Sequence, residues 1–191
     1  LAGDEGDDFV HDTAGRNYLS GGAGDDYIEL EGATLVAGGP GDDEIDRRGD
    51  GNILAMNRGH GSDTAYFYPF TETGRFTLSL GQGISPSDLT LERDGSDLVL
   101  GTGADESLRL AGWYSDDGPL AVEGMLQVVS DDVRIYDFLE AARAFDAAYA
   151  ADPYVGAWPL WGALEANLLE ASTDHAIGGN LAYQYATTGS I

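Results

Sequence analysis

A nine-residue pattern runs through the first third of this 191-residue chain. In almost every block the fourth residue is glycine, the sixth is Asp, Asn or Thr, and the eighth is aliphatic. The blocks read GDEGDDFVH at 3–11, DTAGRNYLS at 12–20, GGAGDDYIE at 21–29, LEGATLVA at 30–37, GGPGDDEID at 38–46, RRGDGNILA at 47–55 and, after two extra residues, RGHGSDTAY at 58–66. A phase held over seven blocks indicates a repeated structural unit.

Each block divides into a turn and a strand. Its first six residues are rich in glycine, which adopts positive φ angles at low cost, and its last three form a short strand whose middle side chain points inward. Two successive blocks complete one coil, so turns two blocks apart stack. The inward positions form an unbroken aliphatic series: Val10, Leu19, Ile28, Val36, Ile45, Leu54 and Ala65. The pattern therefore predicts a mainly β fold that contains a right-handed parallel β-roll.

The interior of such a roll is thin, and its turns are acidic. Two aliphatic side chains per coil bury too little apolar surface to offset the conformational entropy lost by eighteen residues. Stacked aspartates add electrostatic repulsion. Ca²⁺ reverses the sign of this term, because it takes six to eight oxygen ligands and the turns offer both carbonyl and carboxylate oxygens.

The two edges of the predicted roll differ in their sixth-position residues. One edge carries Asp8, Asp26, Asp43 and Asp63, and the other carries Asn17, Thr34 and Asn52. We expect about two to three calcium ions on the first edge, one for each neighbouring pair of turns. The expected ligand positions are Gly3, Gly6, Asp8, Gly21, Gly22, Ala23, Gly24, Asp26, Gly38, Gly39, Pro40, Gly41, Asp43 and Asp63.

Some acidic residues of the turns have simpler interpretations. The Asp63 site is the least regular, because Met56 and Asn57 interrupt the spacing before it. The alternative for all the sixth-position aspartates is that they cap ordinary Asx turns and bind no ion. The fifth-position carboxylates Asp7, Asp25 and Asp42 are expected to face solvent and to help only electrostatically. The second edge is expected to stack through amide and hydroxyl hydrogen bonds.

The repeat G-G-x-G-x-D-x-U-x resembles that of the RTX (repeats-in-toxin, haemolysin-type calcium-binding) family. The stretch LGQGISPSDLTLERDGSDLVL at 80–100, followed by LRLAGWYS at 108–115, resembles the haemolysin-type calcium-binding-related domain that often follows such repeats. These resemblances imply a secreted, extracellular bacterial protein exported by type I secretion machinery. They also imply that the second stretch closes the open end of the roll, with Trp113 in its core.

The rest of the chain suggests three regions: the calcium-binding roll at 1–66, a β capping region of short antiparallel strands at 67–130 and a helical segment at 131–191. We expect one helix from 133 to 150, capped by Ser130 and ended by Asp152-Pro153, and a second from 160 to 171. The tail from 174 is compatible with a hairpin, with the start of further structure or with a secretion signal.

One face of the roll presents an outward apolar stripe that requires a cover. The stripe consists of Tyr18, Ser20, Leu35, Ala37, Ile53 and Ala55. We expect the C-terminal helices of the same chain to lie on it, with a partner protein as the alternative.

Composition limits the remaining functions. A net charge of -25 disfavours nucleic acid and anionic membranes as partners, and the absence of cysteine excludes disulfides and thiol chemistry. No apolar run is long enough to cross a bilayer. The histidines His11, His60 and His175 are scattered and no H-E-x-x-H occurs, so we expect no autonomous enzyme.

The sequence therefore predicts a calcium-binding RTX module of a large secreted protein, disordered at low calcium and folded outside the cell. It would support secretion and folding of a parent toxin, enzyme or adhesin. The alternative is a protein- or glycan-binding adhesin module that uses the helical segment. The tripeptide Arg48-Gly49-Asp50 spells an adhesion motif, but it falls inside a repeat turn.

Overall fold

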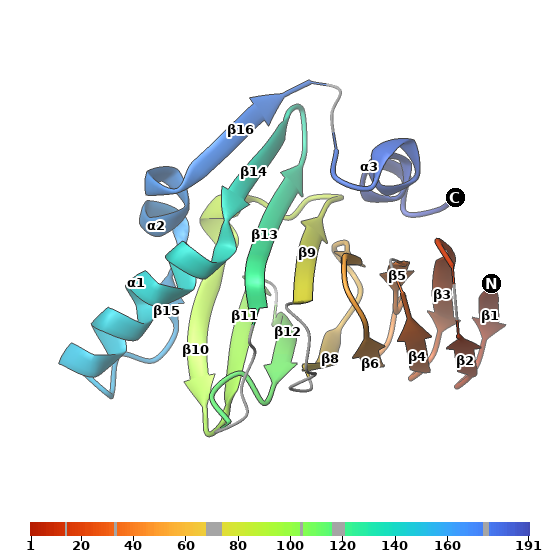
Figure 1. Cartoon of the computed structure of the whole chain (residues 1–191), viewed down its shortest axis with the longest axis horizontal. Coiled ribbons are helices and arrows are strands. Elements are labelled where there is room, and N and C mark those ends of the chain that lie inside the picture. Colours follow the sequence, from red (N-terminus) through yellow and green to blue (C-terminus); the bar gives the residue numbers. More distant parts are fainter. Residues whose placement is uncertain (14, 33, 68–73, 104, 116–120, 174–175) are drawn as a thin grey trace.

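The computed structural model describes the chain except residues 14, 33, 68–73, 104, 116–120 and 174–175 (Figure 1). Nearly half of the described residues lie in two eight-stranded sheets, and a small helix lies near the C-terminus. The molecule is therefore mainly β, as the sequence predicts.

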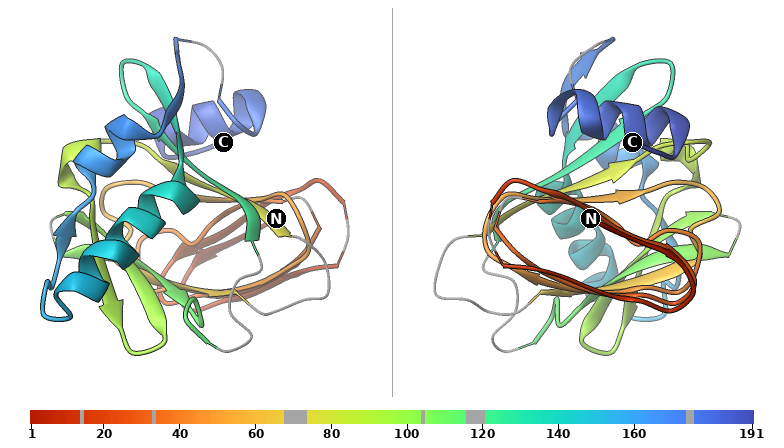
Figure 2. Two further views of the ribbon diagram at one scale, coloured as in Figure 1. Left: turned by 60° about the vertical axis from the view of Figure 1, so that its left-hand side comes forward. Right: turned by 90° about the vertical axis from the view of Figure 1, so that its right-hand side faces the viewer.

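The repeat blocks form the N-terminal half of both sheets. Their strands are β1 (Ala2–Glu5), β2 (Phe9–Asp12), β3 (Tyr18–Ala23), β4 (Tyr27–Glu31), β5 (Leu35–Ala37), β6 (Glu44–Arg48), β7 (Asn52–Met56) and β8 (Ser62–Phe67). Odd-numbered strands pair in parallel in one sheet and even-numbered strands pair in parallel in the other. Figure 2 looks along this stack in its right-hand view, where the coils overlie one another. The parallel strands are consistent with a β-roll.

The pairing register follows the nine-residue phase. Val10 lies opposite Ile28, and Ile28 lies opposite Ile45. All seven predicted inward side chains are at most 3% exposed, so this prediction is confirmed. The interior also holds one charged group that the pattern does not mark. Arg47 is buried with its guanidinium 5.7 Å from the centre of the Phe76 ring, and burial lowers its pKa to about 10.

The strands that follow the repeats differ from the prediction. They are β9 (Gly74–Leu80), β10 (Thr90–Asp94), β11 (Asp97–Gly103), β12 (Glu106–Ala111) and β13 (Ala121–Val129), with the short 3-10 helix η1 (Pro86–Asp88) before β10. We expected antiparallel strands throughout, but β9 pairs in parallel with β7 and with β13, and β12 pairs in parallel with β8. The last coil leaves two open parallel edges, and strands running in the same direction continue those ladders. Antiparallel pairing then begins, between β10 and β11 and between β11 and β12.

A single hydrophobic cluster joins the repeat interior to the strands and helices beyond it. It begins at Val10 in the first coil and extends to Leu164. Trp113 belongs to this cluster, as predicted, with its ring edge-to-face against Phe76 at 6.2 Å and Phe138 at 5.9 Å between centroids. The end of the roll is therefore covered by apolar side chains from later in the chain.

The first predicted helix begins later than expected. Residues 133–137 form β14 (Val133–Asp137), which pairs antiparallel with β13, and α1 covers Phe138–Ala151. Asp137 rather than Ser130 is the N-cap, because its carboxylate accepts the Glu140 N–H at 3.0 Å. Val133 and Ile135 alternate with polar residues, and the open edge of β13 favours a strand there. The C-cap at Asp152 agrees with the prediction.

The second predicted helix is also shorter than expected. It covers only α2 (Trp161–Ala166), and Leu168–Ser172 forms β16, which pairs with β14. The two-residue strand β15 (Trp158–Pro159) pairs with β10. Both corrections have one cause: strand edges provided by distant parts of the chain override local helix propensity.

The C-terminal tail does not form the hairpin that was one of our alternatives, because it folds as α3 (Gly179–Thr188). This helix lies on the apolar stripe of the repeat sheet, where Ala182 and Tyr185 pack against Leu35, Ala37 and Ala55 (Figure 1). The predicted cover by the same chain is confirmed for α3. Helices α1 and α2 lie at the opposite end of the molecule.

A buried charge should release α3 from the stripe. Ala182 has no exposed surface, so Ala182→Glu places a carboxylate against apolar side chains at a cost of about 2–4 kcal/mol. We expect a lower melting temperature and faster proteolysis of the tail. The exposed Gln184→Glu on the same helix is the matched control and should change neither. Equal behaviour of the two variants would show that α3 does not depend on this contact.

Candidate metal centre

The four turns with an aspartate at the sixth position stack directly on one another, and we call them the aspartate edge: residues 3–8, 21–26, 38–43 and 58–63. Backbone bonds join neighbouring turns, including Gly24 N–H to Pro40 O at 3.0 Å and Gly41 N–H to His60 O at 3.1 Å. Gly39 has φ of +129°, and a Cβ there would collide with the Gly22 carbonyl oxygen. The close stacking of the turns therefore requires glycine.

The sixth-position aspartates form a ladder along this edge. The Asp26 Oδ1 atom accepts the Asp8 N–H at 2.8 Å, and the Asp43 Oδ1 atom accepts the Asp26 N–H at 2.9 Å. The Asp63 Oδ1 atom accepts the Asp43 N–H at 3.2 Å. The structure thus brings together the four aspartates that the sequence places on one edge.

The second oxygen of three of these aspartates has no partner. The Oδ2 atoms of Asp8, Asp26 and Asp43 are buried and accept no hydrogen bond. Asp63 has no buried oxygen of this kind. Each unpaired oxygen lies beside the first glycine of its own turn, where a Cβ would collide with the carboxylate. An unpaired buried carboxylate oxygen is costly unless a cation or a proton neutralises it. The residues present therefore fit a bound cation.

Burial also changes the acidity of this column. Desolvation, with a smaller contribution from neighbouring carboxylates, raises the pKa of Asp43 to about 7 and that of Asp63 to about 8. Desolvation raises the pKa of Asp26 as well. Without metal, protons therefore compete for these sites near neutral pH.

Side chains alone cannot complete a metal site here. Among the described residues, no group of three or more His, Cys, Asp or Glu side chains is arranged to hold a metal ion. An ion on the aspartate edge would need backbone oxygens for most of its ligands. The glycine, alanine and proline positions of the predicted ligand set carry such carbonyl groups, and each carbonyl oxygen has two lone pairs. A shell of carbonyl oxygens with a few carboxylates suits Ca²⁺.

The fifth-position aspartates do more than we predicted. Asp7, Asp25 and Asp42 are exposed, as expected. However, Asp7 Oδ1 accepts the Asp25 N–H at 3.0 Å, Asp25 Oδ1 accepts the Asp42 N–H at 2.9 Å, and Asp42 Oδ1 accepts the Ser62 N–H at 2.8 Å. The expectation of a purely electrostatic role was wrong. The only signal in the sequence was the doubled aspartate of these three turns.

The opposite edge has a different chemistry. The Asn52 Oδ1 atom accepts the Thr34 N–H at 3.1 Å, so an amide side chain bridges two coils there, as predicted. The predicted hydroxyl bond is not formed by Thr34, whose Oγ1 atom is buried without a hydrogen-bond partner. Asn17 Nδ2 donates to Asp12 Oδ2 at 2.7 Å. In place of a column of carboxylates, this edge has neutral side chains at its sixth positions.

The adhesion tripeptide is engaged within the molecule. Asp50 forms an ion pair with Arg75 at 3.1 Å and accepts the Arg75 backbone N–H, and the side-chain bond to Arg75 lowers the pKa of Asp50. Arg48 pairs with Glu29 at 3.1 Å and with Asp46 at 3.3 Å. Both charged ends of the tripeptide therefore have structural partners.

The histidines that the sequence offers do not form one site. His11 pairs with Glu29 at 3.1 Å on an exposed face, and His60 is buried with its Nε2 atom 3.3 Å from the Tyr185 hydroxyl. His175 lies outside the described residues. These positions agree with the scattered arrangement in the sequence.

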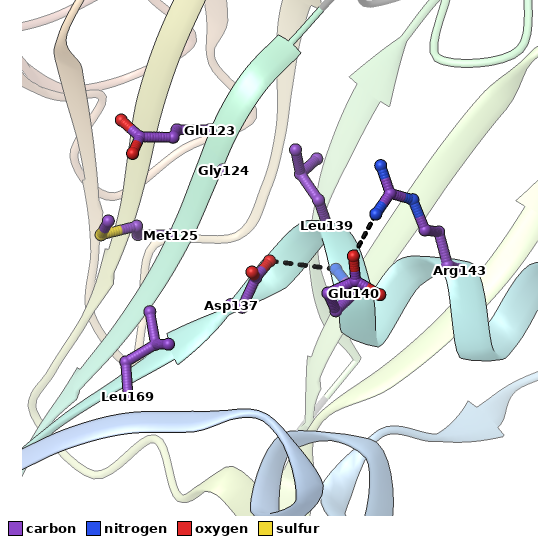
Figure 3. Close-up of a pocket in the computed structure, with 8 residues that line it drawn as sticks. All are labelled: Glu123, Gly124, Met125, Asp137, Leu139, Glu140, Arg143 and Leu169. Carbon is purple, nitrogen blue, oxygen red and sulfur yellow. Dashed lines mark hydrogen bonds and ion pairs between the residues drawn. The ribbon is translucent and has the colours of Figure 1, made fainter.

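A hollow of about 280 Å³ lies beside α1, away from the aspartate edge (Figure 3). Of its carboxylates, Asp137 caps α1, and Glu140 forms an ion pair with Arg143 one turn along the helix. The third carboxylate, Glu123, lies 4.0 Å from Arg75, so all three have structural partners.

Comparison with protein-family models identifies the repeats. Residues 2–34 match the RTX calcium-binding nonapeptide repeat, in four copies. The N-terminal part of this chain consists of RTX repeats. Such repeats bind calcium in general, and their presence at residues 2–34 implies a calcium-binding module of a bacterial protein.

The other comparisons add less. The RTX match includes the turns at 3–8 and 21–26, and the turn at 38–43 has the same G-G-x-G-D-D pattern as the turn at 21–26. A search of curated proteins gave no match. Within the described residues, no helix has the length and apolar character needed to span a membrane.

Filling the space beside one unpaired oxygen should weaken calcium binding by the aspartate edge. Gly38 does not have a positive φ, so Gly38→Ala tests crowding alone: its Cβ would displace the Asp43 carboxylate. We expect about a tenfold or greater loss of apparent calcium affinity by calorimetry. Gly162→Ala, where the new Cβ meets no atom within 4 Å, is the control and should bind normally.

The raised carboxyl pKa values predict how stability and calcium affinity of the folded aspartate edge depend on pH. A carboxyl group whose pKa is raised in the folded state stabilises that state below the unfolded pKa of about 4, and this stability is lost as pH rises to about 7 for Asp43 and 8 for Asp63. Burial lowers the pKa of His60 to about 4, which has the opposite effect, but only below about pH 6.5.

We therefore compare pH 6.5 with pH 8.5, an interval that spans the raised pKa values of Asp43 and Asp63. In saturating calcium, the melting temperature should not fall between these two pH values. Apparent calcium affinity should rise over the same interval, with proton release detectable by calorimetry in buffers of different ionisation enthalpy. A calcium affinity independent of pH would argue against buried carboxylates as ligands.

Proposed function

We propose that residues 1–66 form a right-handed β-roll whose aspartate edge binds two to three calcium ions, one between neighbouring turns. The observation that supports this most strongly is the set of unpaired, buried Oδ2 atoms on Asp8, Asp26 and Asp43. Each lies next to turns that carry carbonyl oxygens. A divalent cation there would convert carboxylate repulsion into attraction between coils.

Calcium then controls folding of the module. The ion binds the folded roll and not the unfolded chain, so it stabilises the fold by RT ln(1 + [Ca²⁺]/Kd). Extracellular calcium modules have dissociation constants of about 10⁻⁴–10⁻³ M, which lie above cytosolic and near extracellular calcium concentrations. With a net charge of -25, the metal-free chain repels itself.

This dependence suits export. RTX repeats typically belong to secreted bacterial proteins. The three earlier turns of the aspartate edge would stay unfolded in the cytosol, the chain would pass through type I secretion machinery, and folding outside would proceed from the capping region (67–130) and the C-terminal segment (131–191) toward the N-terminus. The module has no catalytic role in this proposal, and it supports a toxin, enzyme or adhesin domain elsewhere in the parent protein.

The chain offers a matched test of the metal ligands. The double variant Asp26→Asn/Asp43→Asn removes two negative charges. It keeps the Oδ1 atoms that accept the backbone N–H groups of Asp8 and Asp26. Asp25→Asn with Asp42→Asn makes the same charge change in the same turns, on the exposed ladder. We expect the first pair to raise the calcium midpoint of folding by about tenfold or more, and the second by about twofold or less.

The measurement is far-UV circular dichroism during a calcium titration, with magnesium as the control. The unsubstituted chain should gain β signal cooperatively with calcium and not with magnesium. A chain fully folded in chelator, or equal shifts for the two double variants, would contradict the proposal.

A further inference from the structure

The aspartate edge ends at an irregular turn. Met56 and Asn57 are inserted before it, and Arg58 occupies the first position, where the other three turns have glycine. Met56 is buried in the main core. Asn57 is also buried, and its Nδ2 atom donates to the Tyr185 carbonyl of α3 at 3.0 Å. The insertion thus fastens this turn to two other parts of the molecule.

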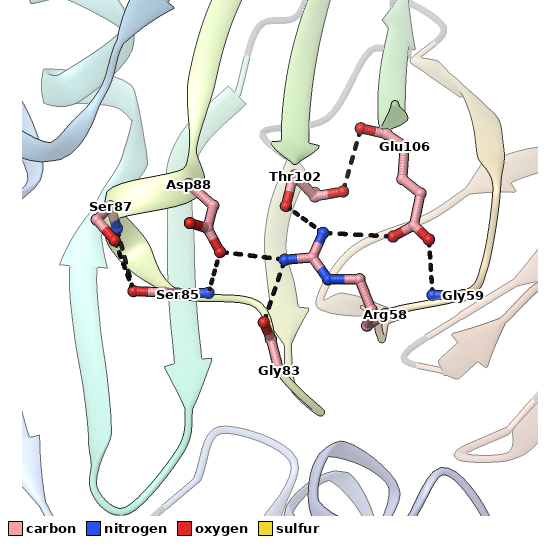
Figure 4. A network of polar contacts seen from close by, with 8 residues as sticks. All are labelled: Arg58, Gly59, Gly83, Ser85, Ser87, Asp88, Thr102 and Glu106. Carbon is pink, nitrogen blue, oxygen red and sulfur yellow. Dashed lines mark hydrogen bonds and ion pairs between the residues drawn. The ribbon is translucent and has the colours of Figure 1, made fainter. Parts of the chain in front are cut away.

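The Arg58 guanidinium lies among four oxygens (Figure 4). It donates to the carbonyl oxygen of Thr102 at 2.7 Å and to that of Gly83 at 3.1 Å. It also pairs with Asp88 at 3.1 Å and with Glu106 at 3.5 Å. Two carbonyl and two carboxylate oxygens, drawn from separate segments, surround one positive group.

This group lies where the stack of turns would continue. Strand β8 pairs with β6 on one side and with β12 on the other. Ser107 N–H donates to Gly61 O at 3.2 Å, and Glu106 Oε1 accepts the Gly59 N–H at 2.8 Å. The segment leading into β12 therefore packs on the last turn as another repeat turn would. Arg58 lies on that side, and Asp43 lies on the opposite one.

We propose that Arg58 is a permanent cation that closes the aspartate edge, so that the turn at 58–63 is held to the capping region without metal. This inference rests on the proposed function, in which the three earlier turns depend on calcium. A guanidinium keeps its charge at all physiological pH values and offers five N–H donors in a rigid plane. Unlike Ca²⁺, it cannot dissociate. It neutralises Asp88 and Glu106 whether or not calcium is present.

Hydrogen exchange resolved by residue tests this directly, in chelator and in calcium. In chelator, the amides of Gly59 and Ser107 should remain protected, because they bond across the closed end. The amides of Gly22 and Gly24, which bond between earlier turns, should gain protection only with calcium.

Arg58→Met should reduce protection of Gly59 and Ser107 in chelator by about tenfold or more, because four charge-assisted or polar contacts are lost. Arg58→Lys keeps the charge but not the planar donors, so it should give a smaller loss. Arg16→Met, which removes the same charge from an exposed position on the other edge, is the control and should have no effect.

The outcomes separate the two proposals. If the Gly59 and Ser107 amides exchange in chelator as fast as those of Gly22 and Gly24, the proposed role of Arg58 is wrong. The proposal that the aspartate edge binds calcium would not be affected. Unchanged protection in Arg58→Met would overturn the role of Arg58 as well. Protection of Gly22 and Gly24 in chelator would instead contradict calcium-dependent folding. The measurements on the unsubstituted chain decide the question even if Arg58→Met does not fold.

Discussion

The buried carboxylate oxygen between stacked turns is the constraint on which the rest of this structure depends. Asp26 and Asp43 each use one oxygen to hold the preceding turn and leave the other unpaired, and Asp8 in the first turn also has an unpaired buried oxygen. The glycines of the repeat follow from this arrangement, because a Cβ at Gly21 or Gly38 would occupy the space beside the free oxygen. Glycine and aspartate therefore serve one purpose in each turn: a close stack that leaves room for a cation.

The two oxygens of each inner aspartate separate structure from metal binding. The hydrogen bonds accepted by the Oδ1 atoms do not require a negative charge, because an amide oxygen can accept them equally well. On the other edge, the Asn52 amide oxygen accepts the Thr34 N–H in this way. The Oδ2 atoms have no such substitute. The exposed ladder of Asp7, Asp25 and Asp42 adds hydrogen bonds without burying charge. An acidic turn thus contributes both backbone order and a charge that needs compensation.

Sequence reasoning succeeded where the determinant is local and repeated. The inward positions and the aspartate column follow from the nine-residue phase, and so does the stripe under α3. It failed where a strand edge supplied by a distant segment decides the outcome. Val133–Asp137 carries a helix-compatible sequence, yet it pairs with β13, and β9 extends a parallel ladder that begins in the repeats. No period in the sequence marks such edges.

Arg58 illustrates a signal that was present and not interpreted. From the sequence, only the inserted Met56 and Asn57 were considered. The arginine after them, in a position that the other turns of this edge give to glycine, could not be interpreted because its partners Gly83, Thr102 and Glu106 lie far along the chain. Its meaning depends on the cap, and the cap could not be placed from the repeats.

The distribution of charge links the repeats to the cap. Residues 1–46 contain 13 acidic side chains and one arginine, Arg16, whereas the remaining 145 residues contain 21 acidic side chains and eight arginines. Several of those arginines form ion pairs within the later strands, such as Arg109 with Asp97 at 3.0 Å. The later part of the chain thus carries more of its own neutralising charge, whereas the first coils carry little. Under the proposed function, the need for external cations therefore increases toward the N-terminus, so the part with more internal ion pairs can order first and present an ordered turn to the part with fewer.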